Sequence, residues 1–153
     1  MMCNCDGLFK DFKSGDLESL RLEGLPKNRG VYAIRIRGRG KPVNDVILSM
    51  EDFCRKTEWV PFSEYVLDRT TRLKNIGECP LVYIGAAPTS LRSRYSDLCG
   101  RRHTGFYPIL ALLMNGWRLD YEYFETEKPK QFEKSLKDRY EKIHKSLPAL
   151  VKK

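Results

Sequence analysis

Two tyrosines, one arginine and one glutamate stand in short motifs whose residue types suit chemistry on a phosphate ester. The motifs are Gly30-Val31-Tyr32, Val82-Tyr83-Ile84-Gly85, Leu91-x-x-Arg94 and the isolated Glu133. Hydrolysis of a phosphodiester requires an activated water and a cation beside the phosphoryl oxygens. An arginine fork binds phosphate, a carboxylate can hold Mg²⁺, and a phenol can accept a proton if its pKa, about 10 when free, is lowered.

Short apolar segments are expected to form the strands that position the two tyrosines. The segment Gly30 to Arg37 alternates apolar and basic residues from Ile34 onward, which indicates a half-buried strand. Leu81 to Gly85 is a second apolar segment that stops at a glycine. Residues 117–124 alternate well and predict a third strand.

Helices are expected to position the arginine and the glutamate. After Pro88, a helix capped by Thr89 or Ser90 carries an apolar stripe, and Arg94 lies beside that stripe at about 100° per residue. Two further helices are predicted, a buried one from Phe106 to Met114 and a long one over 129–145 that carries Glu133 in its first turns.

The remaining segments have weaker patterns. A short capped helix is expected from Asp16 to Arg21. Residues 43–80 are expected to form an insertion packed on the main domain, with one helix starting near Ser49 and another from Ser63 to Lys74. The insertion could contact a ligand or close a cleft.

Length and composition indicate a single folded domain over residues 1–153. The hydrophobic content is 41%, and the longest apolar run, Ile109 to Met114, is too short to span a bilayer. The first residues lack the features of a signal peptide, so a cytoplasmic protein is expected. The net charge of +8 is concentrated in the blocks 30–41, 86–118 and 128–153, which suits a phosphate-rich partner.

The five cysteines show no zinc-knuckle spacing, so reduced thiols in a reducing compartment are expected. A zinc site assembled from Cys3, Cys5, Cys54 and Cys79 is the alternative. His144, on the basic last helix, is expected at the surface.

The order strand, insertion, strand, helix, helix, strand, helix, with the four motifs above on these elements, resembles the GIY-YIG nuclease family. Gly30-Val31-Tyr32 matches the first family motif, and Val82-Tyr83-Ile84-Gly85 the second. The family arginine falls on Arg94 and the family glutamate on Glu133. The resemblance implies an α/β (α+β) fold, with a three-stranded antiparallel sheet flanked by helices and with the insertion 43–80 between the first two strands.

The resemblance also implies a metal-dependent endonuclease that hydrolyses DNA, with RNA as an alternative substrate. Glu133 would hold Mg²⁺ or Mn²⁺, and Arg94 would bind the scissile phosphate. Tyr32 and Tyr83 would flank the attacking water, and one of them could act as general base. His103 is a rival base because its ordinary pKa lies closer to neutrality.

Basic side chains are expected to hold the nucleic-acid backbone without reading its sequence. They are Arg35, Arg37, Arg92, Arg101, Arg102, Lys130 and Lys137. Two departures from the family pattern support an alternative, a catalytically inactive module that binds nucleic acid. Ala86 replaces the lysine that often follows the second motif, and no asparagine follows the last helix. A third possibility is an adaptor whose insertion binds a protein.

Overall fold

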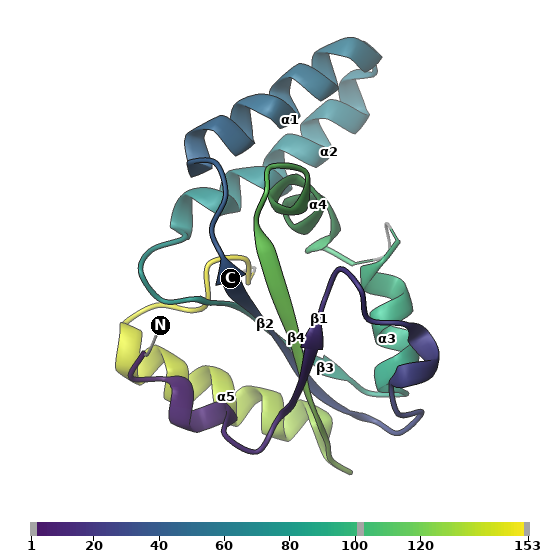
Figure 1. Ribbon diagram of the computed structural model, residues 1–153, viewed down its shortest axis with the longest axis vertical. Coiled ribbons are helices and arrows are strands. Elements are labelled where there is room, and N and C mark those ends of the chain that lie inside the picture. The colour runs from purple at the N-terminus through teal and green to yellow at the C-terminus, as the bar shows by residue number, and fades with distance from the viewer. Residues whose placement is uncertain (1–2, 101–102, 152–153) are drawn as a thin grey trace.

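The computed structural model describes residues 3–100 and 103–151 (Figure 1). It combines five α-helices with a four-stranded sheet in this part of the chain. The elements in chain order are the 3₁₀ helix η1 (Asp6–Phe9), β1 (Lys13–Asp16), η2 (Leu22–Gly24), β2 (Gly30–Gly38), α1 (Val43–Thr57), α2 (Val60–Thr70), η3 (Thr71–Asn75), β3 (Leu81–Ala87), α3 (Leu91–Leu98), α4 (Phe106–Met114), β4 (Arg118–Glu125) and α5 (Pro129–His144).

The sheet has the order β1-β4-β2-β3, and every neighbouring pair is antiparallel. The mixed α/β class and the antiparallel sheet are confirmed, but the prediction of three strands was wrong by one. The additional strand β1 pairs with β4, with Lys13 opposite Tyr123. Its four residues are largely exposed at the sheet edge, so the sequence there carries no apolar alternation that would reveal a strand.

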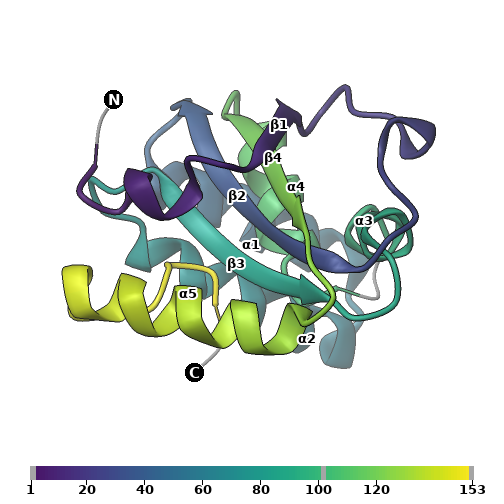
Figure 2. The ribbon, with the colours of Figure 1, turned by 90° about the horizontal axis from the view of Figure 1, so that it is seen from below.

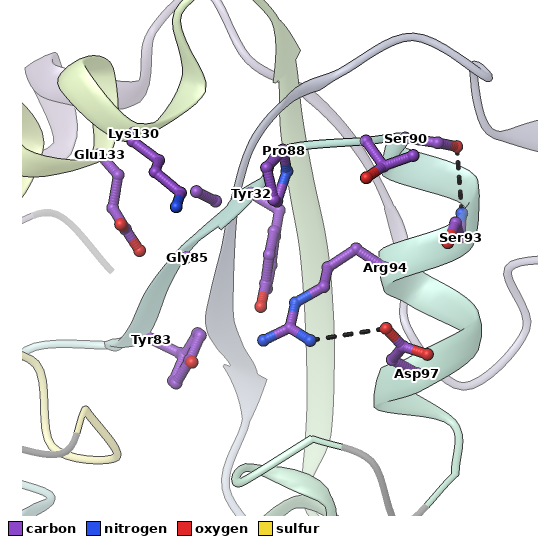
Figure 3. Close-up of a pocket in the computed structure, with 12 residues that line it drawn as sticks. Tyr32, Tyr83, Gly85, Pro88, Ser90, Ser93, Arg94, Asp97, Lys130 and Glu133 are labelled. Atoms are coloured by element: carbon purple, nitrogen blue, oxygen red, sulfur yellow. Dashed lines mark hydrogen bonds and ion pairs between the residues drawn. The ribbon is translucent and has the colours of Figure 1, made fainter.

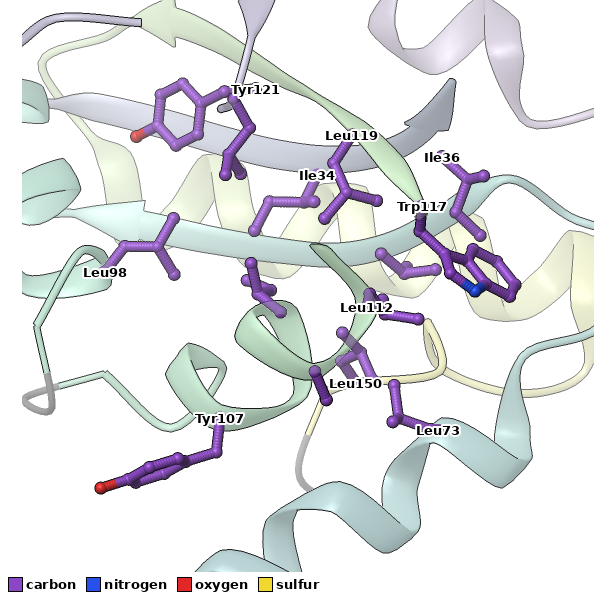
Figure 4. Close-up of a cluster of buried hydrophobic side chains, with 14 of the residues drawn as sticks. Ile34, Ile36, Leu73, Leu98, Tyr107, Leu112, Trp117, Leu119, Tyr121 and Leu150 are labelled. Atoms are coloured by element: carbon purple, nitrogen blue, oxygen red, sulfur yellow. The ribbon is translucent and has the colours of Figure 1, made fainter. Parts of the chain in front are cut away.

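Helices cover both faces of the central strand β2. Tyr32, Ile34 and Ile36 belong to the larger core on the side of α1 to α4, part of which Figure 4 shows. Val31 and Ala33 belong to a second core that includes α5 and the N-terminal segment. Figure 2 shows α5 running along that face of the sheet. Burial on both faces explains why β2 begins with a continuous apolar run and not with an alternating one.

The insertion is a pair of helices followed by a 3₁₀ turn, and it rises above the sheet in Figure 1. Both helices begin earlier than expected, at Val43 instead of Ser49 and at Val60 instead of Ser63. A proline lies at or next to the start of each helix. It favours the early start, because the N–H that proline lacks would be unpaired at that position anyway. Buried side chains of the insertion join the larger core.

The helix expected from Asp16 to Arg21 does not form. Asp16 ends β1, and the chain then turns and enters η2. The hydroxyl of Tyr95 donates to the carbonyl oxygens of Leu17 (2.8 Å) and Leu20 (3.1 Å). These contacts hold the turn that replaces the expected helix, so a distant side chain contributes to the local conformation.

The three helices after β3 follow the expectations closely. The hydroxyl of Ser90 accepts a hydrogen bond from the Ser93 backbone N–H (3.2 Å) and caps α3. Helix α4 spans the predicted residues, and α5 begins at Pro129. No helix in the described part of the chain has the length and apolar character needed to cross a membrane.

Candidate active site

A pocket of about 480 Å³ lies where β2, β3, α3 and α5 meet (Figure 3). We call it the tyrosine pocket. Its lining residues are Tyr32, Tyr83, Gly85, Ala86, Pro88, Thr89, Ser90, Ser93, Arg94, Asp97, Lys130 and Glu133. Four of the five expected catalytic residues therefore line one cavity, although each comes from a different element. His103 is the fifth, and it contacts Tyr32.

The two glycine motifs allow the tyrosine pocket to form. Tyr32 and Gly85 are direct partners in the β2–β3 register. A Cβ atom at Gly85 would lie 2.5 Å from both Cζ and Oη of Tyr32, so only glycine lets the Tyr32 ring lie across β3. A Cβ atom at Gly30 would come within 2.9 Å of the Leu91 side chain and would also collide with the Phe124 backbone oxygen. The glycines are thus required by close packing.

The two tyrosines differ in accessibility. Tyr32 is 1% exposed, and its ring stacks between Tyr83 and Tyr121 at centroid distances of 5.8 and 5.5 Å. Burial and the neighbouring Tyr83 phenol raise the pKa of Tyr32 well above its ordinary value, while the charge of Arg94 opposes this shift. Tyr32 is therefore protonated at neutral pH. Tyr83 is half-buried and is the tyrosine more open to solvent.

His103 lies against Tyr32 and is itself buried. Burial and the Arg94 charge lower the pKa of His103 to about 3, so the ring is neutral at pH 7. Its Nδ1 accepts a hydrogen bond from the Gly105 backbone N–H (2.8 Å), which places the single ring proton on Nε2. Nε2 lies 2.5 Å from the Tyr32 oxygen and donates to it. Both ring nitrogens are engaged, so these contacts suit orientation of Tyr32 better than direct activation of water.

Arg94 extends from α3 toward Tyr32 (Figure 3). Its Nη1 forms a 3.5 Å ion pair with Asp97 one helical turn away. Its Nε is buried and has no hydrogen-bond partner among the described residues. A buried donor without a partner is energetically costly. The Asp97 contact, which we did not anticipate, is detectable in the sequence as an opposite charge at i+3.

Glu133 and Lys130 reach the tyrosine pocket from the first turns of α5. Oε2 of Glu133 accepts a hydrogen bond from Lys137 at 3.1 Å, and the Glu133 side chain is 23% exposed. A single accessible carboxylate with room for water fits Mg²⁺, which keeps much of its hydration shell. Glu133 therefore fits the expected metal ligand. Lys130 supplies a pocket cation from α5.

The other expected nucleic-acid contacts are mostly engaged within the protein. Arg35 pairs with Asp6 and Glu122, at 2.6 and 2.9 Å. Arg37 likewise pairs with acidic side chains, among them Asp120 at 2.7 Å. These intramolecular pairs favour structural roles for both arginines.

A third arginine, on helix α3, is also engaged within the protein. Arg92 Nε donates to the Leu25 carbonyl at 3.1 Å and so holds the segment before β2. Lys137 pairs with Glu133. Lys130, in contrast, is an expected nucleic-acid contact that lines the tyrosine pocket. Arg101 and Arg102 lie outside the described residues.

No family model, curated protein or solved structure matched this chain significantly.

Proposed function

We propose that this protein is a metal-dependent endonuclease that hydrolyses DNA phosphodiester bonds at a site of the GIY-YIG type. One observation supports the proposal above all others. Tyr32 and Glu133 are 101 positions apart in the sequence, yet both line the tyrosine pocket together with Tyr83 and Arg94. The residue types meet the needs of phosphate-ester hydrolysis.

In this proposal the two pocket cations bind the scissile phosphate. Arg94 offers the forked terminal nitrogens of its guanidinium, and Lys130 approaches from α5. Glu133 would hold Mg²⁺ or Mn²⁺, which when bound supplies a Lewis acid for the phosphoryl oxygens. Lys137 fixes the Glu133 carboxylate from the next helical turn.

The tyrosines flank the position of the attacking water. Tyr32 accepts the Nε2–H of His103, and this hydrogen bond holds its ring in place. Because Tyr32 is buried and stays protonated, we assign it a positioning role. Tyr83, the more accessible phenol, would lie next to the attacking water. The cysteines, which are all free thiols, support a cytoplasmic location.

Nicking of supercoiled plasmid DNA in the presence of Mg²⁺ tests the proposal. We expect Glu133→Gln and Arg94→Ala each to slow nicking by about 100-fold or more. Matched controls come from similar ion pairs on helices outside the pocket. Asp138→Asn removes an i,i+4 partner of Lys134 on the same helix, and Arg55→Ala removes an i,i+3 partner of Asp52. If the pocket variants nick as fast as the controls, the assignment is wrong.

A non-catalytic nucleic-acid-binding module is the second candidate. It is favoured by the ion pairs that already engage Glu133 and Arg94 and by Ala86 in place of the family lysine. This candidate predicts salt-sensitive DNA binding without metal-dependent cleavage. Measuring binding of the same plasmid alongside nicking separates the two functions, because only the endonuclease shows both.

A further inference from the structure

Three cysteines and one histidine gather at the opposite end of α5 from the tyrosine pocket. The four ligand atoms all lie within 4.8 Å of one another. They come from three segments, the N-terminal stretch, the loop before β3 and the last turn of α5. We call this group the Cys₃His cluster, and its members are Cys3, Cys5, Cys79 and His144.

The separations within the Cys₃His cluster match those of a tetrahedral zinc ion. Two sulfur ligands of such an ion are about 3.8 Å apart, and a sulfur and an imidazole nitrogen about 3.6 Å. In the structure, Sγ of Cys5 and Sγ of Cys79 are 3.6 Å apart. Sγ of Cys3 and Nε2 of His144 are 3.4 Å apart. All four ligand atoms lie within 4.8 Å of one another, so the widest separation needs to shorten by only about 1 Å to complete the tetrahedron.

The surroundings also resemble those of a structural metal site. Cys5 is fully buried, whereas Cys3, Cys79 and His144 border a pocket of about 850 Å³ through which an ion could enter. The Tyr140 hydroxyl donates to Sγ of Cys79 at 3.4 Å. The Tyr140 ring also packs on the His144 ring, at a centroid distance of 4.4 Å. Tyr140 thus holds two ligands in place, as the groups around a bound metal commonly do.

A disulfide is the main competing explanation for two close thiols. The Cys5 and Cys79 sulfurs are 3.6 Å apart, compared with about 2.05 Å in a disulfide. A disulfide would also leave Cys3 and His144 without a reason to converge on the same point. A single ion explains all four positions together.

We propose that the Cys₃His cluster binds one Zn²⁺ ion in a tetrahedral structural site. The ion would join the N-terminal segment and the loop before β3 to the end of α5. The site differs from the all-cysteine alternative considered from the sequence, because Cys54 lies in α1 with its side chain in the larger core. It shares no residue with the tyrosine pocket, so this inference stands independently of the proposed nuclease activity.

The test uses the full chain, purified under reducing conditions, stripped with a chelator and then given Zn²⁺ alone. We expect about one zinc ion per chain after desalting, and a rise in Tm of about 5–10 °C on zinc binding. Co²⁺ in place of zinc should give the thiolate charge-transfer bands and the d–d absorption of a tetrahedral site.

Variants assign the ligands. Cys79→Ser and His144→Gln should each weaken zinc binding by more than about 100-fold, since even supporting residues contribute 10- to 100-fold. Cys99→Ser, which removes an exposed thiol outside the cluster, should bind zinc like the wild type.

The proposal fails if the refilled wild type holds no stoichiometric zinc, or if Co²⁺ gives no tetrahedral spectrum. It also fails if mass spectrometry of the reduced preparation shows a Cys5–Cys79 disulfide, or if Cys79→Ser and His144→Gln bind zinc as well as Cys99→Ser does. Should a ligand variant fail to fold, the metal content and the Co²⁺ spectrum of the wild type still decide the question.

Discussion

The two ends of α5 carry two clusters that are assembled in different ways. Near its N-terminus, Glu133 and Lys130 contribute to the tyrosine pocket, in which Tyr32, Tyr83 and Arg94 project from β2, β3 and α3. Near its C-terminus, His144 meets three cysteines that lie in irregular segments. The pocket is built on regular elements, which hold side chains in fixed directions. The Cys₃His cluster instead gathers segments that have little secondary structure of their own.

This difference suggests that the two ends of α5 have different roles. A rigid framework is what a reactive site needs, because small displacements of its groups are costly. A metal is most useful where the backbone is not already fixed by a sheet or a helix. We infer that the N-terminal end of α5 serves chemistry and the C-terminal end serves stability.

The strongest test of this division compares one variant at each end of α5, because each variant should lose a different property. Glu133→Gln should reduce nicking by about 100-fold or more while leaving zinc binding intact. His144→Gln should abolish stoichiometric zinc while retaining Mg²⁺-dependent nicking, assayed well below its Tm. Plasmid nicking and metal analysis of both variants provide the readouts. If each variant loses both properties, the two ends of α5 are not independent.

A second test concerns the close packing under the tyrosine pocket. Gly85→Ala should destabilise the protein by about 1–3 kcal/mol, because the added methyl group meets a Tyr32 ring that is stacked on both sides and cannot move away. Gly77→Ala is the matched control, since a Cβ atom there meets nothing within 4 Å. Urea denaturation of both variants gives the comparison. Equal stabilities would show that Tyr32 does not depend on the glycine.

The buried His103 predicts how stability depends on pH. Its pKa is about 3 in the folded state and 6.5 ordinarily, so the unfolded chain takes up a proton first as the pH falls below 6.5. The free energy of unfolding should therefore decrease by up to about 1.4 kcal/mol per pH unit below pH 6.5, until the folded state is also protonated near pH 3.

Denaturation between pH 6.5 and 5 measures this slope above the range in which most carboxylates titrate, and the variant below separates His103 from Glu122, whose pKa is raised by burial. His103→Gln should make the slope shallower. An unchanged slope in that variant would mean that His103 is not the group responsible.

The smallest predicted effect concerns Tyr140. Tyr140→Phe removes the hydroxyl that donates to Cys79 and should weaken zinc binding by about tenfold. Tyr65→Phe, at an exposed position on α2, is the control. Competition with a chromophoric zinc chelator measures both affinities. A Tyr140→Phe protein with wild-type affinity would remove Tyr140 from the support of the cluster.

Regular elements with strong local signals could be predicted from the sequence. The Ser90 cap, the fully apolar run of α4 and Pro129 at the start of α5 each act within a few residues, so their structural effect is visible locally. β1 could not be predicted in this way, because an exposed edge strand needs only a partner strand and no particular residues.

The candidate catalytic residues were named from the resemblance of the sequence motifs to the GIY-YIG family, and their catalytic roles stay predictions. The sequence could not show that Arg35, Arg37 and Arg92 are engaged within the protein, since their acidic and carbonyl partners are distant in the chain. It also missed His144 as a partner of Cys3, because these residues are 141 positions apart.

The sequence by itself therefore determined the helices with clear local signals, three of the four strands and the residue types available for chemistry. The tertiary structure alone decided which of these side chains share a cavity and which are neutralised by partners. The physical reason is range. Capping and periodicity act over one or two helical turns, whereas the tyrosine pocket and the Cys₃His cluster depend on contacts that only the packed sheet and α5 bring together.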